Sequence, residues 1–275
     1  MWTPAASTLM RVSALLPVAG ALLLGTPARA HLPGEGGIDV TEEYSSVFFG
    51  IEGVGFRRGA VPGGYFSLRF AGQWAPRPYL GLGLTAPVHW VWAEGAAGQR
   101  GIGEPTGFVR IRLWRHPRIP FAVGTGISYA FPSIHHQTEA GTSYGELTPF
   151  LRLGGTWRAL GYAAQLAPLV ALGSGGTPTF VNPHSTLELR ARGELSWAAS
   201  PRLTASLGFE TALVLAAEER GAMVRILLPG LALRPAPGWQ FLLLGELPVG
   251  GSRRLDWRIL TGVSVDARAW AAPPH

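Results

Sequence analysis

The sequence predicts an all-β protein, specifically an antiparallel transmembrane β-barrel of about twelve strands with short periplasmic turns and longer extracellular loops. Alternation of residue type is the first reason, and it is clearest in Ser185–Trp197. Odd-numbered positions there are mainly apolar, and even-numbered positions are mainly charged or polar. Because a strand sends successive side chains to opposite faces, this segment has one apolar face and one charged face.

Most of the chain repeats this design. Two of the later runs, Ala222–Arg234 and Trp239–Val249, are apolar on both faces, and Arg225 interrupts the pattern, which predicts a β-bulge or a lumen filled locally by side chains. A count between 10 and 14 strands fits the pattern, and twelve runs are the best reading. The twelve predicted strands are Tyr44–Phe56, Tyr65–Trp74, Tyr79–Trp92, Gly107–Trp114, Phe121–Phe131, Tyr144–Trp157, Gly161–Leu172, Ser185–Trp197, Leu203–Leu215, Ala222–Arg234, Trp239–Val249 and Leu255–Trp270.

The connections between these runs alternate in length. Such asymmetry is typical of bacterial outer-membrane barrels, whose periplasmic turns are short and whose extracellular loops are long. The short connections, which contain proline or glycine or are only a few residues long, are Ala75–Pro78, Arg115–Pro120, Arg158–Leu160, Ala198–Arg202 and Pro235–Gly238. The others, mostly longer, are Arg57–Gly64, Ala93–Thr106, Pro132–Ser143, Gly173–His184, Ala216–Gly221 and Gly250–Arg254.

Tryptophan provides the third observation, because it gathers beside the short turns. Indole has an apolar body and one N–H donor, so it settles at the boundary between lipid and water. The alternative is a soluble barrel with these rings in its core, but their position at strand ends favours a membrane rim. We predict a short-turn rim of Trp74, Trp114, Trp157, Trp197, Trp239 and Trp270, and an opposite rim that includes Trp90 and Trp92.

The first thirty residues carry the features of a secretory signal peptide. Arg11 supplies a positive charge, Val12–Gly25 is apolar, and Ala28-Arg29-Ala30 is a cleavage signal. We therefore predict a signal peptide at 1–30 cleaved after Ala30, a periplasmic segment at 31–43, the barrel at 44–270 and a tail at 271–275. After the signal peptide, the chain has no uninterrupted apolar stretch of helix-spanning length.

Composition limits the remaining classes of protein. The chain has no cysteine, all of its 23 basic residues are arginine, and its formal net charge is +6. The arginines are spread along strands and turns instead of forming a cluster, so we expect no nucleic-acid partner.

The charged faces of the predicted strands would project into one lumen. Charges in such a place need water or partners, because isolated burial of an ion is costly. They could form a polar path that selects solutes, or a lattice of ion pairs that fills a narrow barrel and conducts nothing. The predicted lumen-lining residues are Arg69, Gln73, Arg110, Arg112, Glu146, Arg152, Gln165, Glu188, Arg190, Arg192, Glu194, Glu210, Asp256 and Arg258.

Three other motifs are candidates for a catalytic, metal-binding or nucleotide-binding site. Gly141–Gly145 matches the serine hydrolase pattern G-x-S-x-G with Ser143 at its centre, and His135, His136 and Glu139 lie nearby, but no helix follows as a nucleophile elbow requires. The same histidines with His184 or His89 lack the spacing of a known metal site. Gly101–Gly107 resembles a nucleotide-binding loop, but no helix follows it. We therefore expect no enzyme activity, no catalytic residues, no cofactor and no metal.

Two stretches resemble a known family. Gly98–Arg115 is similar to the loop and basic strand of the outer-membrane proteins of the phenol-degradation MetA-pathway family, and Phe121–Ser133 is similar to their following strand. The resemblance extends loosely from Tyr44 to the end of the chain. It implies a barrel that moves hydrophobic or aromatic compounds across the outer membrane.

These observations together predict an outer-membrane channel or transport protein for small molecules. Its expected partners are outer-membrane lipid, the outer-membrane assembly machinery and a small-molecule solute. Two alternatives stay open: a lipid-modifying outer-membrane enzyme that uses Ser143 and a loop histidine, and a structural barrel without flux.

Overall fold

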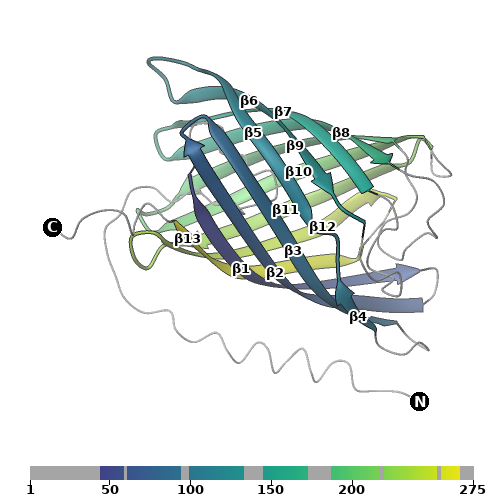
Figure 1. Cartoon of the computed structure of the whole chain (residues 1–275). Coiled ribbons are helices and arrows are strands. Elements are labelled where there is room, and N and C mark those ends of the chain that lie inside the picture. The colour runs from purple at the N-terminus through teal and green to yellow at the C-terminus, as the bar shows by residue number, and fades with distance from the viewer. Residues whose placement is uncertain are drawn as a thin grey trace.

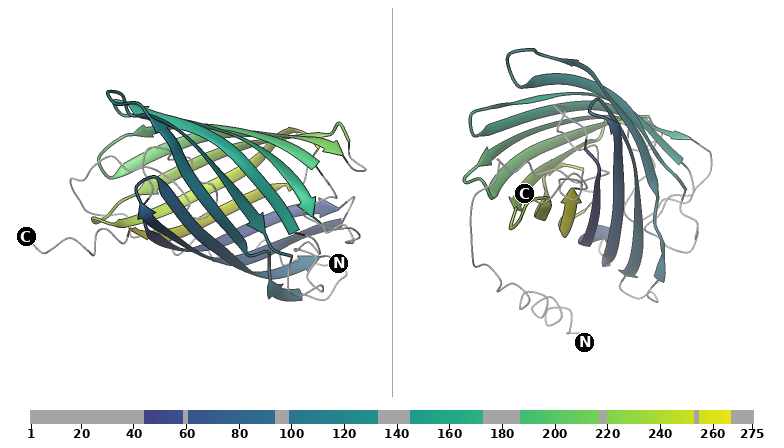
Figure 2. Two further views of the ribbon diagram at one scale, coloured as in Figure 1. Left: turned by 45° about the horizontal axis from the view of Figure 1, so that its top comes forward. Right: turned by 60° about the vertical axis from the view of Figure 1, so that its left-hand side comes forward.

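In the computed structural model, thirteen strands form one antiparallel sheet that closes on itself (Figure 1). The structure describes residues 44–58, 61–93, 99–132, 145–172, 187–216, 220–252 and 255–266. Apart from β4, each strand pairs with the strands before and after it in the chain, and pairing of β1 with β13 closes the ring. The side and oblique views in Figure 2 show the tilted strands surrounding a common axis.

Twelve of these strands make the barrel, as the alternation predicted, so the predicted fold class is confirmed. The thirteenth, β4, pairs only with β3. The strands are β1 (Ser46–Arg58), β2 (Val61–Arg77), β3 (Leu80–Ala93), β4 (Gln99–Ile102), β5 (Thr106–Arg115), β6 (Phe121–Ala130), β7 (Gly145–Trp157), β8 (Leu160–Leu172), β9 (Leu187–Ala198), β10 (Leu203–Ala216), β11 (Met223–Leu233), β12 (Trp239–Gly251) and β13 (Trp257–Asp266).

Two connections differ from the expectation. The segment Arg57–Gly64 was predicted as a loop, but β1 and β2 stay paired as far as Arg58 and Val61. Residues Gln99–Ile102 were also predicted as loop and instead form β4, which covers the edge of β3 beyond the end of β5. In both places backbone pairing extends into sequence that lacks alternation, because ladder hydrogen bonds require no particular side chain except at proline.

Burial separates the two faces of each strand. In β10, Thr204, Ala212 and Val214 are buried, whereas Leu207 and Phe209 on the opposite parity are exposed. The other barrel strands show the same contrast, so one parity points into the barrel and the other forms an outer surface rich in large apolar side chains.

Apolar layers fill part of the interior at two levels. Towards the short turns, Phe48 packs in a buried cluster with Ala71, Ala232, Leu242 and Leu260. The Phe48 ring lies over Gly50 and Gly262, where a Cβ atom would overlap it. Towards the long loops, a second buried cluster is formed by Val54, Tyr65, Val91 and Leu255.

The irregular pattern around Arg225 corresponds to both expected features. The register of β11 against β12 shifts between Arg225 and Ile226, as at a β-bulge. Further along the same strands, Ala232, Leu242 and Leu244 belong to the apolar layer near the short turns or pack against it. These strands are apolar on both faces because the inward side chains join the apolar layer of the interior and the outward ones belong to the apolar outer surface.

Candidate functional site: the barrel interior

An internal cavity of about 410 Å³ occupies the half of the barrel nearer the long loops. Its wall includes side chains from almost every strand. Four arginines, Arg69, Arg190, Arg192 and Arg258, line it. Four glutamates line it as well, namely Glu104, Glu146, Glu210 and Glu246. The charges of these eight side chains thus balance, and apolar side chains lie between them in the same wall.

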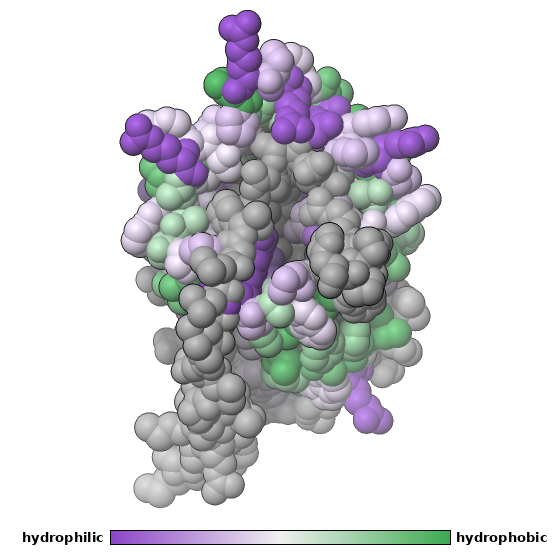
Figure 3. All heavy atoms as spheres, turned by 90° about the vertical axis from the view of Figure 1, so that its left-hand side faces the viewer, coloured by the Kyte–Doolittle hydropathy of each residue, from purple (hydrophilic) through white to green (hydrophobic). Residues whose placement is uncertain are grey.

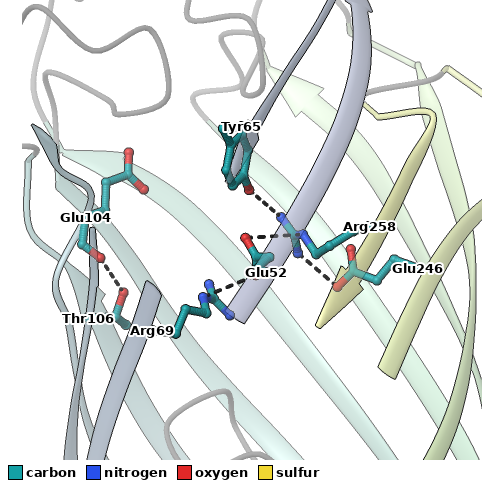
Figure 4. Close-up of polar contacts among 7 residues, drawn as sticks. All are labelled: Glu52, Tyr65, Arg69, Glu104, Thr106, Glu246 and Arg258. Carbon is teal, nitrogen blue, oxygen red and sulfur yellow. Dashed lines mark hydrogen bonds and ion pairs between the residues drawn. The ribbon is translucent and has the colours of Figure 1, made fainter. Parts of the chain in front are cut away.

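Glu52 organises one wall of this cavity. Its side chain is 0 % exposed, and its carboxylate lies 3.2 Å from Arg69 Nε and 3.9 Å from Arg258 Nε. Arg258 also contacts the Glu246 carboxylate at 2.9 Å and donates to the Tyr65 hydroxyl at 3.4 Å. Figure 4 shows Glu52 between the two arginines, with Arg258 reaching Tyr65 and Glu246. We call Glu52, Arg69, Glu246 and Arg258 the Glu52 cluster.

The Glu52 cluster lies between the two apolar layers. On the same inward face of β1, Val54 lies two residues from Glu52 and belongs to the layer near the long loops, which we call the upper layer. Phe48 lies four residues away on the other side and belongs to the lower layer, near the short turns. Tyr65 joins the cluster to the upper layer, and its ring packs edge-on against His89 at 4.9 Å between centroids. Glu52 itself is fully buried between these layers, so separating its carboxylate from the two arginines costs more than it would on a surface.

The opposite wall carries a second group of charges, centred on β9. Arg190 Nε lies 3.0 Å from the Glu188 carboxylate, and Arg192 lies 3.3 Å from that of Glu194. Strand pairing places Arg192 directly between Gln165 of β8 and Glu210 of β10. The inward face of β9 therefore holds four charges in succession, each with an oppositely charged neighbour.

The half of the barrel nearer the short turns is packed with side chains. Arg152 is 1 % exposed, and Arg110 and Gln73 are also buried. Arg110 donates a hydrogen bond to the Gln73 side-chain oxygen, and its guanidinium lies 4.4 Å from the centroid of the Phe108 ring. With the layer around Phe48, these groups narrow the interior below the cavity.

The structure brings many of the predicted lumen residues together. Seven of the fourteen line the cavity, and four more lie buried in the described structure. Three are partly exposed: Arg112, Glu194 and Asp256. The cavity-lining residues are Arg69, Glu146, Gln165, Arg190, Arg192, Glu210 and Arg258, and the buried ones are Gln73, Arg110, Arg152 and Glu188.

Sequence reasoning missed several polar residues of this interior, among them Glu52, Tyr65, His89, Glu104 and Glu246. Glu52 falls in the least regular predicted strand, and Glu246 falls in one that is apolar on both faces. A lone carboxylate within an apolar membrane strand was itself a usable signal, because such a group requires a cationic partner.

Seven of the eight predicted rim tryptophans are exposed on the outer surface, and Trp270 lies outside the described residues. Five residues of the other candidate motifs also lie outside the described residues, namely Ser143, His135, His136, Glu139 and His184. Among the described residues, no three histidine, aspartate or glutamate side chains are grouped as metal ligands. None of the described segments forms an apolar helix of membrane-spanning length.

Comparison with known proteins identifies relatives by fold. No protein-family model matches the sequence, and no curated protein matches it either. An outer-membrane channel from Pseudomonas putida F1 has a similar structure, with a TM-score of 0.61 and 10 % identity over 86 % of this chain and 100 % of that one. The NanC porin has a TM-score of 0.53 and 9 % identity, covering 79 % and 98 % of the two chains. The KdgM porin in complex with disordered oligogalacturonate has a TM-score of 0.51 and 13 % identity, covering 80 % of this chain and 98 % of that one.

Proposed function

We propose that this protein is a channel or transport protein for small molecules in the bacterial outer membrane. One observation carries the proposal: a closed barrel presents large apolar side chains outward and encloses a cavity of about 410 Å³ with charged walls. An apolar outer face suits lipid, and ring closure removes the unpaired sheet edges that would be costly there.

The fold comparisons support this placement and role. Three of the similar structures are an outer-membrane channel and two porins. The exposed tryptophans beside the short turns fit a rim at the boundary between lipid and water. On this basis the short turns face the periplasm and the long loops face the exterior.

The cavity walls suggest a solute with both apolar and polar parts. Phe108, Phe150, Leu169 and Leu228 line the cavity together with the charged residues named above. Its volume lies within the range of small-molecule sites, roughly 300–1,000 Å³. Resemblance to the MetA-pathway family adds hydrophobic or aromatic compounds as the class of cargo.

Planar-bilayer recording of the purified protein tests the proposal. Transport by a water-filled path predicts discrete channel events, whereas complete absence of events at all voltages would contradict such a path. Uptake into protein-loaded vesicles should then be compared for phenol and its charged analogue benzoate. Uptake of either solute beyond that of protein-free vesicles would support the aromatic class, and a preference for phenol would show that the cargo is uncharged. Exclusion of both would contradict the aromatic class.

A barrel without flux is the second candidate, and the packed short-turn half favours it. Arg152, Arg110 and the layer around Phe48 occupy the interior there. Silent bilayers together with no uptake of either solute would support this candidate over transport.

We also propose that the chain is exported, cleaved after Ala30 and inserted by the outer-membrane assembly machinery. N-terminal sequencing of protein purified from outer membranes should begin at His31. A sequence that begins at Met1, or protein recovered only from the cytoplasm, would contradict this route.

A further inference from the structure

We propose that the short-turn end of the barrel binds anionic phospholipids through a ring of arginines. This inference rests on the membrane placement proposed above. It concerns the outside of the barrel and is independent of any solute. The ring, which we call the arginine rim, consists of Arg77, Arg115, Arg118, Arg158, Arg202 and Arg234.

Positive charge predominates at this end, although Asp266 at the end of β13 lies beside the Pro235–Gly238 turn. All five short connections belong to the described residues; four of them carry an arginine, Arg234 immediately precedes the fifth, and none of the five contains aspartate or glutamate. Arg77, Arg115, Arg118 and Arg158 are exposed, and the other two are partly exposed. Figure 3 faces this end and shows strongly hydrophilic side chains projecting outward around it, with apolar side chains on the wall below. Arginine stays cationic at all ordinary pH values, so the excess of positive charge at this end attracts anions.

Hydrogen bonds fix the backbone that carries these arginines. Nδ1 of His116 accepts from the backbone N–H of Arg118 and of Ile119, at 3.1 Å each. Oγ of Ser200 accepts from the N–H of Arg202 at 3.2 Å. The Arg234 N–H donates to the Arg202 carbonyl at 2.8 Å, which holds two neighbouring turns and their two cations together. The backbone positions of Arg118, Arg202 and Arg234 are therefore fixed before any ligand arrives, and this lowers the cost of binding.

Arg158 adds a separate observation. It has φ of 54°, and among the described residues it is the only non-glycine with positive φ. Glycine or asparagine would adopt this left-handed conformation with less strain. An arginine at this position disfavours the turn while placing its guanidinium 5.2 Å from the centroid of the Trp157 ring. Strain of this kind points to a role for the side chain itself.

Tryptophan neighbours identify the ligand as a lipid. Trp74, Trp114, Trp157, Trp197 and Trp239 are exposed on the outer wall close to these arginines in sequence. Indole rings mark the interface, so the arginines just beyond them lie at the depth of lipid phosphates. The cations are also distributed over all five turns around the barrel, which suits a surrounding leaflet better than one acidic protein partner. Guanidinium binds phosphate through paired hydrogen bonds, so anionic headgroups such as phosphatidylglycerol fit best.

Quenching of tryptophan fluorescence by brominated lipids tests this inference on the full protein in vesicles. Brominated phosphatidylglycerol should bind about threefold or more tightly relative to brominated phosphatidylcholine, and added salt should reduce the ratio. A variant with Gln at positions 77, 115, 118, 158 and 202 should bring the ratio close to one. The matched control, Arg100→Gln with Arg220→Gln, removes exposed arginines near the long loops and should keep the wild-type ratio.

The outcomes separate this inference from the membrane placement on which it rests. If phosphatidylcholine does not quench wild-type fluorescence, the membrane placement fails. If it quenches but phosphatidylglycerol binds no better, or if the five-site variant keeps its preference, only the lipid inference is overturned.

Arg158→Gly distinguishes a lipid role from a structural one. Because glycine relieves the strained φ, this variant should unfold no more easily than the wild type and yet show a lower phosphatidylglycerol preference. Loss of stability with unchanged preference would assign Arg158 to the turn alone and contradict its place in the rim.

Discussion

At the scale of single residues, Glu52 is the buried charge that joins Arg69 and Arg258 on one wall of the interior. It is 0 % exposed and lies between Arg69 and Arg258. Replacing it with the isosteric Gln would leave two arginines facing each other without a carboxylate between them. Loss of one partner from a buried ion pair costs about 3–5 kcal/mol, so we expect Glu52→Gln to lower the free energy of unfolding by that amount.

Urea unfolding in detergent, followed by gel mobility without heating, measures this change. Glu194→Gln is the matched control, since Glu194 pairs with Arg192 in a more exposed setting. The side-chain exposure is 30 % for Arg192 and 10 % for Glu194. We expect it to cost about 1 kcal/mol or less. Equal effects of the two substitutions would refute the central role of Glu52.

At the scale of strands, β7 shows most directly which face meets lipid. Leu151 lies at the middle of this strand with 51 % of its surface exposed, and Arg152 beside it is buried. If the outer face is in the bilayer, Leu151→Arg places a charge near the midplane and should lower the free energy of unfolding by about 2–4 kcal/mol. Leu160→Arg, at the short-turn end of β8, should cost only about 0–1 kcal/mol. Similar small costs for both would contradict the membrane orientation.

The pairing of β7 with β8 contains a gap. Paired residues are Leu147 with Val170 and Leu151 with Leu166, and Pro149 and Pro168 face each other between them. Proline has no N–H to donate, so the ladder is weakened locally. Hydrogen exchange by mass spectrometry should therefore find faster exchange at Leu151 and Leu166, which border the gap, than at Leu153 and Ala164, which pair two residues further along. Slower or equal exchange at the gap would show that the seam is as tight as its surroundings.

Strand-level features were readable from the sequence because alternation and turn residues are local signals. The twelve barrel strands and the short turns follow from them, with boundaries shifted by a few residues. Pairing between strands is not local, so β4 and the extended β1–β2 hairpin could not be read. The partners of Glu52 were hidden for the same reason, since Arg258 lies on the last strand and meets β1 only when the ring closes.

At the scale of the whole molecule, the interior of this barrel has two halves: a cavity near the long loops and a region packed with side chains near the short turns. Phe48 belongs to the packed region, is 5 % exposed, and lies over Gly50 and Gly262. Those glycines leave no side chain of their own to fill the space that the ring occupies. Removing the ring should therefore open a void below the Glu52 cluster. Because Phe48 is on the inward face of β1, this void should connect with the cavity and not with the outer surface.

If transport passes through the lumen, Phe48→Ala should increase single-channel conductance and the rate of vesicle swelling, because the packed region limits flow. Phe49→Ala is the control, since Phe49 is 44 % exposed on the outer face of the same strand and should leave conductance unchanged. Phe48→Leu offers a milder change in case the alanine variant does not fold, as removal of a buried phenyl ring costs about 3–5 kcal/mol. Folded Phe48 variants with wild-type conductance would show that this layer does not limit flow and would move the constriction to Arg110 and Arg152.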